Sequence, residues 1–320
     1  MAENTETVKG TSLWKDAWRR LLKNKLAVFG LVVMVIMVIA VTIGPAIIRW
    51  TTGYTADYIP SEGNLIKSFP PSLNHPMGTD EAGRDLLARV LQGGRISLMV
   101  GVISTLVSLI VGVSYGAIAG YMGGKIDNLM MRIVDIIYAI PYILIVIVLL
   151  SVFGGPNTPT FIKWMSEKFG GAGNQGLSQI FLLFFALGLV SWLTMARVVR
   201  GQILSLKNQE FVLAARATGV STPNIIFRHL VPNALGPVIV YATLTIPSVM
   251  LTEAFLSFLG LGVQAPYASW GSLASDGIKN IAIYPWQLIF PGVTMALTLF
   301  SLNFLGDGLR DALDPQTRKF

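Results

Sequence analysis

Six stretches of 23 to 29 residues contain no Asp, Glu, Lys or Arg, and this feature constrains the fold more than any other. Because an α-helix rises about 1.5 Å per residue, each stretch can cross the roughly 30 Å of hydrocarbon in a bilayer. Glycine and proline within them are no objection, since both are common in membrane helices. The sequence therefore predicts an all-α integral membrane protein with six transmembrane helices, at Leu26–Ile48, Ile96–Gly124, Ile136–Ile162, Phe169–Ala196, Leu230–Thr252 and Ile281–Gly306.

The overall composition agrees with a membrane protein. Charged residues make up 13% of the chain and hydrophobic residues 53%, with a mean hydropathy of +0.62. Soluble domains carry about 25% charged residues. The chain contains no cysteine, so it offers neither a disulfide framework nor a thiol site.

The net charge of +7 could indicate nucleic acid or anionic lipid, but the distribution of the basic residues decides between them. With the N-terminus inside, 16 of the 24 Lys and Arg residues fall on the cytoplasmic side and 8 outside. The positive-inside rule then places both termini in the cytoplasm and makes lipid, not nucleic acid, the partner of these charges.

The segment before the first span predicts a disordered tail and a short helix. Residues 1–12 are polar, and Ser12 can cap a helix over Leu13–Lys25 with Trp14, Trp18 and Leu22 on one face. This amphipathic helix either lies in the membrane interface or is a charged flank that holds the first span. The first span is too long for a cleaved signal peptide, so we expect an uncleaved anchor.

The loop between the first two spans ends in the motif His75-Pro-Met-Gly-Thr-Asp-Glu-Ala-Gly-Arg-Asp85. Thr79 or Asp80 is the expected cap of a helix leading to the second span. The positive-inside rule conflicts with three arginines that fall in this outside loop, Arg84, Arg89 and Arg95. We therefore expect their segment to be an amphipathic surface helix. His75 has no metal-binding neighbours in sequence and is interpreted as a loop residue.

The second span carries small residues at every fourth position, which allow a second helix to approach closely. We expect this stripe to pack inside one subunit, and a dimer seam is the alternative. The nearby Gly-Gly-Lys is no phosphate loop, because Ile126 stands where Ser or Thr would bind magnesium. The stripe consists of Ser104, Ser108, Gly112, Gly116, Gly120 and Gly124.

Two acids and two connections bear on a translocation pathway. Asp135 and Glu253 lie near the ends of spans, and ionisable groups in spans are functional candidates. Of the two, Glu253 is the stronger candidate. The 3–4 connection is rich in Gly and Pro and is expected to be irregular. The 5–6 connection, with Gly260 and Gly262, predicts either a gate or ordinary loop packing.

The segment Glu210–Asn233 is a polar island between two apolar spans. Ala214 and Ala215 favour a helix of little bulk, and Gly219 can end it with a positive φ. Thr222 can then cap a second helix that starts at Pro223. The island is either a docking surface for a cytoplasmic partner or an ordinary capped helical hairpin.

These residues resemble the coupling loop of ATP-binding-cassette (ABC) importer permeases, whose general form is Glu-Ala-Ala-x₃-Gly-x₉-Ile-x-Leu-Pro. Ala214, Ala215, Gly219 and Pro232 are in register, while Leu213, His229 and Val231 replace Glu, Ile and Leu. The departures resemble the dipeptide, oligopeptide and nickel branch, which Glu210, Arg216 and Arg228-His229 match. The Gly78–Asp85 run, Ser257–Gly262 with Trp270-Gly271, and Gly306–Pro315 are similar to the C-type permease of that branch.

The resemblance covers nearly the whole chain and implies a type I ABC importer permease fold. It divides the chain into the tail 1–12, a leader helix and first span at 13–65, an extracytoplasmic loop and surface helix at 66–95, and a transmembrane domain at 96–320. The coupling loop occupies about 205–233. The candidate coupling residues are Glu210, Ala214, Ala215, Arg216, Gly219, Pro223, His229 and Pro232, and the pathway candidates are Glu253, Gly260 and Gly262.

The implied function is half of a channel in a bacterial or archaeal inner membrane, not an enzyme. The implied partners are a B-type permease, an extracytoplasmic substrate-binding protein, and two cytoplasmic ATPases that hold ATP and magnesium. This chain itself would bind no cofactor or metal. The implied substrate is a di- or oligopeptide, and nickel, glutathione or another small solute are alternatives.

Two other classes of protein fit the composition less well. A stand-alone secondary transporter or channel predicts inverted repeats and charge pairs within the membrane, and neither is evident in the sequence. A membrane scaffold or insertion factor is favoured only by the amphipathic N-terminal segment.

Overall fold

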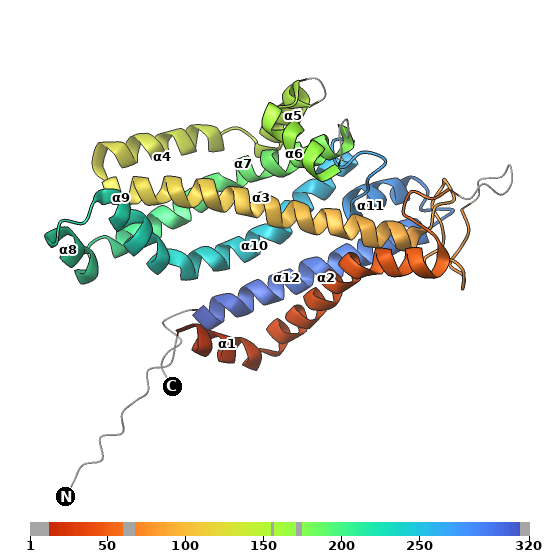
Figure 1. Ribbon diagram of the computed structural model, residues 1–320, viewed down its shortest axis with the longest axis horizontal. Helices are drawn as coiled ribbons and strands as arrows, with labels where there is room; N and C mark the ends of the chain where they lie inside the picture. The colour runs from red at the N-terminus through yellow and green to blue at the C-terminus, as the bar shows by residue number, and fades with distance from the viewer. Residues whose placement is uncertain (1–12, 60–67, 155–156, 171–174, 314–320) are drawn as a thin grey trace, which may run out of the picture.

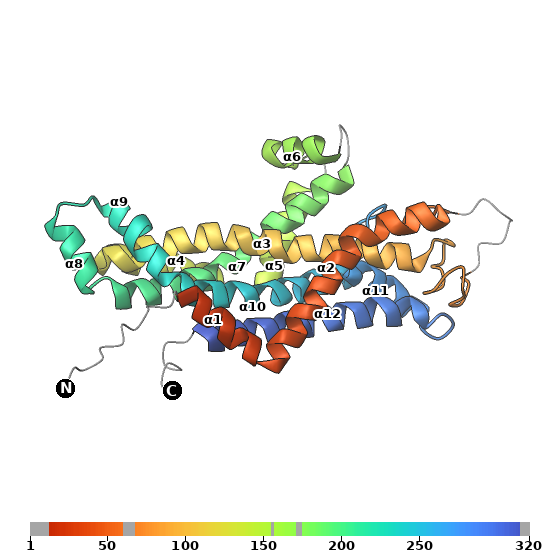
Figure 2. The ribbon, with the colours of Figure 1, turned by 60° about the horizontal axis from the view of Figure 1, so that its bottom comes forward.

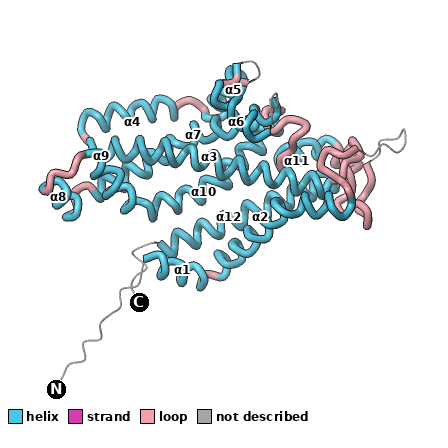
Figure 3. Tube along the Cα trace, in the orientation of Figure 1, coloured by secondary structure: helices cyan, strands magenta, loops and turns pink. Residues whose placement is uncertain are grey.

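The computed structural model describes residues 13–59, 68–154, 157–170 and 175–313, and within them every regular element is a helix (Figures 1 and 3). Five helices in these ranges are long and apolar enough to cross a membrane. A bent helix pair makes a sixth if it counts as one broken span. The predicted all-α membrane fold is confirmed, and the proposed disordered tail and its Ser12 cap lie outside the described residues.

The centre of the bundle is the contact between α3 (Leu86–Met122) and α7 (Gln175–Leu206). An added Cβ on Gly112 would lie 2.6 Å from Cβ of Met195, and one on Gly120 would lie 2.9 Å from the Arg200 carbonyl oxygen. The Ser104 hydroxyl also donates to the Phe184 carbonyl at 2.9 Å. The stripe of small residues therefore packs inside the subunit, as expected, except that Gly124 begins the next helix.

The remaining long helices surround this pair. The helix α10 (Val231–Phe258) packs on α3, α7 and α12 (Trp286–Leu313), and α2 (Lys25–Thr52) packs on α12 and α3. Figure 1 shows α8 and α9 at one end of the bundle. The short helix α11 (Trp270–Lys279) and the loop before α3 lie at the other end. The two connections that the sequence places on opposite sides of the membrane are thus at opposite ends.

The third predicted span, Ile136–Ile162, is wrong as one straight helix. The chain instead forms α4 (Gly124–Tyr138) and α5 (Tyr142–Phe153), which meet at 82°. Pro141 sits at the break, where its missing N–H and its constraint on the preceding residue stop a continuous helix. The following connection is not wholly irregular, because α6 (Thr160–Gly170) lies within it.

Two ion pairs hold α4 against α7. The Arg200 guanidinium donates to both carboxylate oxygens of buried Asp127 at 2.6 Å. Arg197 donates to Asp135 at 2.8 Å and lies 4.2 Å from the centre of the Tyr138 ring. Asp135 is therefore paired at the surface of the helix contact and does not stand alone.

The N-terminal amphipathic helix is present as α1 (Leu13–Lys23). Ala17 and Leu21 are buried in a cluster with Ala312 of α12, whereas Trp18 and Leu22 are about half exposed. Asn24 then caps α2, its side chain accepting from the backbone N–H groups of Leu26 and Ala27. The helix thus packs on the bundle with one face and leaves Trp18 and Leu22 outward.

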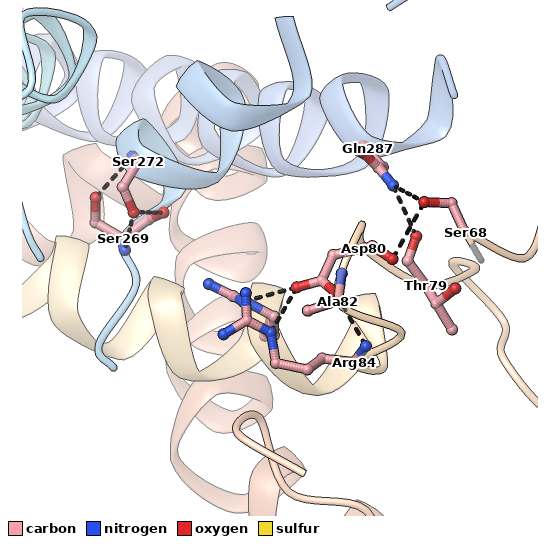
Figure 4. Close-up of polar contacts among 9 residues, drawn as sticks. Ser68, Thr79, Asp80, Ala82, Arg84, Ser269, Ser272 and Gln287 are labelled. Carbon is pink, nitrogen blue, oxygen red and sulfur yellow. Dashed lines mark hydrogen bonds and ion pairs between the residues drawn. The ribbon is translucent and has the colours of Figure 1, made fainter. Parts of the chain in front are cut away.

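The expected cap and surface helix before the second span are both wrong. Asp85 caps α3 by accepting from Ala88 N–H at 2.8 Å, and residues 86–95 continue into the span as one helix. Asp80 instead accepts from Arg84 Nε and Arg89 Nη1, each at 2.7 Å (Figure 4). This pairing explains how Arg89 is buried at the end of a membrane helix.

The loop bearing this cluster is tied to the last span. Gln287 Nε2 donates to the Thr79 carbonyl and to the Ser68 hydroxyl, both at 3.0 Å (Figure 4). His75 Nδ1 lies 2.8 Å from Oδ2 of the capping Asp85. His75 is thus a loop residue, as the sequence predicts, and it has a carboxylate partner that the sequence did not indicate.

Candidate functional site

The predicted coupling segment folds as two short helices at one end of the bundle. The first, α8 (Glu210–Ala217), ends at Gly219, which has φ +77°. Gly219 N–H donates to the Arg216 carbonyl and Val220 N–H to the Ala215 carbonyl, each at 3.0 Å. This pair of bonds is the Schellman pattern that glycine permits at a helix end. The prediction of a positive φ at Gly219 is confirmed.

The second half of the segment is one rod with a change of helix type. It runs from α9 (Thr222–Asn224) through the π-helix η2 (Ile225–Leu230) into α10. Ser221, not Thr222, is the N-cap residue, and it makes no capping hydrogen bond through its side chain. The predicted Thr222 cap is therefore wrong, while Pro223 does lie in the first turn.

Pro232 gives a physical reason for the π-helix. It has no N–H to donate to the Arg228 carbonyl, and its ring crowds that position in an α-helix. Val231 N–H instead donates to the carbonyl of Ile226, five residues back. The side-chain amide of Asn233 donates to the His229 carbonyl at 2.6 Å. The His-Leu-Val-Pro-Asn motif thus builds a defined irregularity between α9 and α10.

The inner face of α8 is packed against this rod. Val212 and Ala215 are buried in one cluster with Ile225, Ile226 and Leu230. Arg216 lies 5.1 Å from the centre of the Tyr121 ring at the end of α3. The buried side chains of α8 thus pack directly on those of η2.

The outer face of α8 is partly apolar and open. Phe211 is 38% exposed and Leu213 is 50% exposed, and Phe227 on η2 is 48% exposed. Six of the eight predicted coupling residues are exposed, whereas Ala215 is buried and His229 is half-buried. The exposed six are Glu210, Ala214, Arg216, Gly219, Pro223 and Pro232.

A cavity of about 550 Å³ opens in the middle of the bundle, where the α4–α5 break faces α7 and α10. Its wall combines aliphatic side chains with hydroxyl groups, and no Asp, Glu, Lys or Arg is among its described lining residues. The hydroxyl-bearing residues are Tyr138, Tyr142, Ser191, Thr194, Tyr241, Thr245, Ser248 and Thr252.

The cavity and the coupling segment share one structural element. The rod Thr222–Phe258 begins at α9, beside α8, and its α10 portion supplies Tyr241, Thr245, Ser248 and Thr252 to the cavity wall. The element that packs against α8 therefore also forms part of the cavity wall.

The predicted pathway residues lie elsewhere. Glu253 is 1% exposed, and its Oε1 accepts from the hydroxyl groups of Ser257 at 2.8 Å and Ser269 at 2.7 Å. Gly260 and Gly262 line a smaller cavity of about 300 Å³ beside α5 and α7. None of the three lines the larger cavity.

Sequence reasoning missed the hydroxyl wall, although a signal for it was present. Tyr241, Thr245, Ser248 and Thr252 recur at three- and four-residue intervals in an otherwise apolar run, so they share one helix face. It also missed the Asp127–Arg200 pair, which no local spacing indicates. The described residues contain no group of three or more His, Cys, Asp or Glu side chains able to hold a metal ion.

Comparison with known proteins identifies the family. Residues 112–319 match the model of the binding-protein-dependent transport system inner membrane component. Residues 12–65 match the N-terminal transmembrane domain of oligopeptide transport permease C.

Full-length relatives support both matches. The chain is 47% identical over 312 residues to the oligopeptide transport system permease protein OppC of Escherichia coli K12, an alignment that covers 97% of this chain and 94% of the relative. It is 46% identical over 312 residues to OppC of Haemophilus influenzae, covering 97% and 91%. It is 44% identical over 317 residues to the dipeptide transport system permease protein DppC of Bacillus subtilis, covering 98% and 90%. The chain therefore belongs to the binding-protein-dependent inner membrane permeases of ABC transporters, as a C-type subunit.

Proposed function

We propose that this permease forms half of the translocation pathway of an ATP-driven importer for di- and oligopeptides. The names of its relatives support this substrate class. The observation that carries the mechanism is the single rod that joins the α8 contact to the wall of the central cavity.

The chemistry of the cavity favours a peptide over a metal ion. Hydroxyl groups can donate to and accept from peptide amides, and aliphatic side chains accommodate varied residues without selecting one. A wall without carboxylate, imidazole or thiolate among its described lining residues offers a nickel ion none of its preferred ligands. Competition of labelled dipeptide uptake by unlabelled peptides, glutathione and nickel would separate these solutes.

The outer face of α8 is proposed to receive a cytoplasmic ATPase. Phe211 and Leu213 supply apolar contact area, and Glu210 and Arg216 supply charge at opposite ends of the helix. Two such ATPases would hold ATP and magnesium, a B-type permease would complete the pathway, and an extracytoplasmic binding protein would deliver the peptide. Both termini would lie in the cytoplasm. An ATPase that binds one position of α8 more tightly would bias the rod between two states.

Gly219→Val tests the coupling role. No atom lies within 4 Å of a Cβ added at Gly219, so the substitution acts through backbone conformation and not through a clash. A side chain at φ +77° costs about 1–2 kcal/mol, which would displace the end of α8. We expect peptide uptake to fall at least severalfold while the abundance of the protein in the membrane stays normal.

Gly201→Val is the matched control. Gly201 lies within α7 near the same end of the bundle, is exposed, and also has no atom within 4 Å of an added Cβ, but its φ is helical. This variant should transport peptide at the wild-type rate. Full uptake by Gly219→Val, or equal loss by both variants, would contradict the proposed role of the α8 end.

A further inference from the structure

A further cavity, also of about 300 Å³, lies between α2 and α3 at the end of the bundle away from α8. Two arginines, Arg49 and Arg95, line it together with Gln92, Tyr54 and Thr55. No Asp or Glu contributes to its wall in the part of the chain that the structure describes. The cavity therefore offers hydrogen-bond donors and positive charge, with no acidic side chain among its described lining residues.

These two arginines differ from their neighbours at the same end of the molecule. Arg84 and Arg89 both form an ion pair with Asp80, each at 2.7 Å. Neither Arg49 nor Arg95 forms an ion pair with any described residue, and both are exposed. Two guanidinium groups on one cavity are suited to bind an anion through paired N–H donors.

The depth of the cavity indicates where this anion resides. The charge-free part of α2 ends at Ile48, one residue before Arg49, and that of α3 begins at Ile96, one residue after Arg95. Arg49 thus lies at the end of the charge-free part of α2, and the side chain of Arg95 reaches the same cavity from α3. Trp50, which is 88% exposed, has the position typical of an interfacial indole.

The helix crossing shapes the floor of the cavity. An added Cβ on Gly44 would lie 2.8 Å from a Leu91 methyl group, and one on Gly94 would lie 2.7 Å from a Val41 methyl group. The helices α2 and α3 therefore touch beside the cavity, and Figure 2 shows the two ribbons crossing. Beyond the contact they leave the space that Arg49 and Arg95 line.

The segment after α2 closes the cavity from above. Gly53 ends the helix at φ +75°, its N–H donating to the Arg49 carbonyl at 3.1 Å. Tyr54 then stacks on Tyr58 and on His75, at centroid distances of 5.7 and 5.2 Å. This stacking holds the tyrosine in place over the groove before any ligand arrives.

We infer that this cavity binds a phosphate group, supplied by the headgroup of an anionic phospholipid at the membrane interface. A phosphodiester is the anion that occupies this depth in every bilayer, and Arg is well suited to its geometry. The inference depends on the membrane-spanning fold alone. It holds whichever leaflet the cavity faces and does not require the proposed substrate or coupling role.

The test is native mass spectrometry of the full chain, purified within its transporter in detergent and titrated with phosphatidylglycerol. Removing each guanidinium should weaken lipid retention on the order of fivefold, so R49Q/R95Q should lose it almost completely. K279Q is the control, because Lys279 is an exposed cation at the same end, paired with Asp276 outside the cavity. It should retain lipid as the wild type does.

A second variant separates the effect of the arginine charges from the effect of the space available to the lipid. Ala46 lines the cavity, so A46F should fill part of it and lower lipid retention while both arginines remain. Competition with inorganic phosphate distinguishes the two sources of the anion. Lipid that resists displacement by phosphate supports the inference. Displacement by phosphate alone would replace the lipid with a soluble anion and overturn it, as would equal retention by the wild type and R49Q/R95Q.

Discussion

At the scale of the residue, buried polar side chains fix short connections to the long helices. Glu253 accepts from Ser257 on its own helix and from Ser269, the N-cap of α11. Ser269 and Ser272 bond each other's backbone N–H groups in a capping box (Figure 4). Trp270 is fully buried and donates from Nε1 to the Val90 carbonyl at 2.8 Å. The conspicuous Ser-Trp-Gly sequence therefore anchors α11 to α10 and α3.

Glu253→Gln distinguishes this positioning role from a role in the pathway. The amide oxygen of Gln can still accept from both serine hydroxyl groups, so peptide uptake and stability should stay near the wild-type values. Glu253→Ala, which leaves both hydroxyl groups without their acceptor, should lower the free energy of unfolding by about 1–3 kcal/mol. Uptake assays and thermal unfolding in detergent check both. Loss of uptake by a stable Glu253→Gln protein would restore Glu253 to the pathway.

At the scale of the element, the helix geometry is irregular at two places along the proposed coupling route. The π-helix η2 lies between α9, next to α8, and α10. The 82° bend at Pro141 forms the wall of the central cavity on the α4–α5 side. Single π turns within helices occur often at functional sites. Both irregularities have a local cause in a proline, at Pro232 and Pro141.

Pro232→Ala should convert η2 toward a regular α-helix. The new N–H can donate to the Arg228 carbonyl, so the helix itself should become more stable. Because a π turn holds one more residue than an α turn, the change would rotate α8 and α9 relative to α10. We expect unchanged or increased thermal stability with reduced peptide uptake. Retention of full uptake, alongside amide-exchange data showing a regular helix, would remove η2 from the coupling mechanism.

At the scale of the whole molecule, the permease is a bundle with two different ends. One end carries α8 and its exposed apolar side chains, and the other carries α11 (Figure 1). The second end also carries Asp80 with its two arginines (Figure 4) and the cavity lined by Arg49 and Arg95. The central cavity lies between the two ends and is open to the outside of this subunit.

The absence of cysteine makes the orientation directly measurable. Ala217→Cys on α8 and Ala282→Cys after α11 place single thiols on exposed positions at opposite ends. With intact cells, a membrane-impermeant maleimide should label Ala282→Cys alone. Ala217→Cys should react only after the membrane is opened and should cross-link to an ATPase. Labelling of Ala217→Cys from outside would place α8 on the wrong side for coupling.

Local chemistry determined much of this protein from the sequence alone. Charge-free runs identify membrane helices because an unpaired charge is unstable in hydrocarbon. Gly219 predicts a helix end with a positive φ, because other residues are strained in that conformation. The stripe from Ser104 to Gly120 likewise requires a close helix neighbour. These features depend on a residue and its nearest neighbours in the chain.

Only the tertiary structure decided what lies far apart in sequence. It paired Asp127 with Arg200 and turned Glu253 toward Ser269 and away from the central cavity. It also brought the hydroxyl face of α10 opposite the α4–α5 break, which no single segment specifies. The reason is that a cavity or an ion pair is a property of the distance between helices, and that distance is set by the packing of the whole bundle.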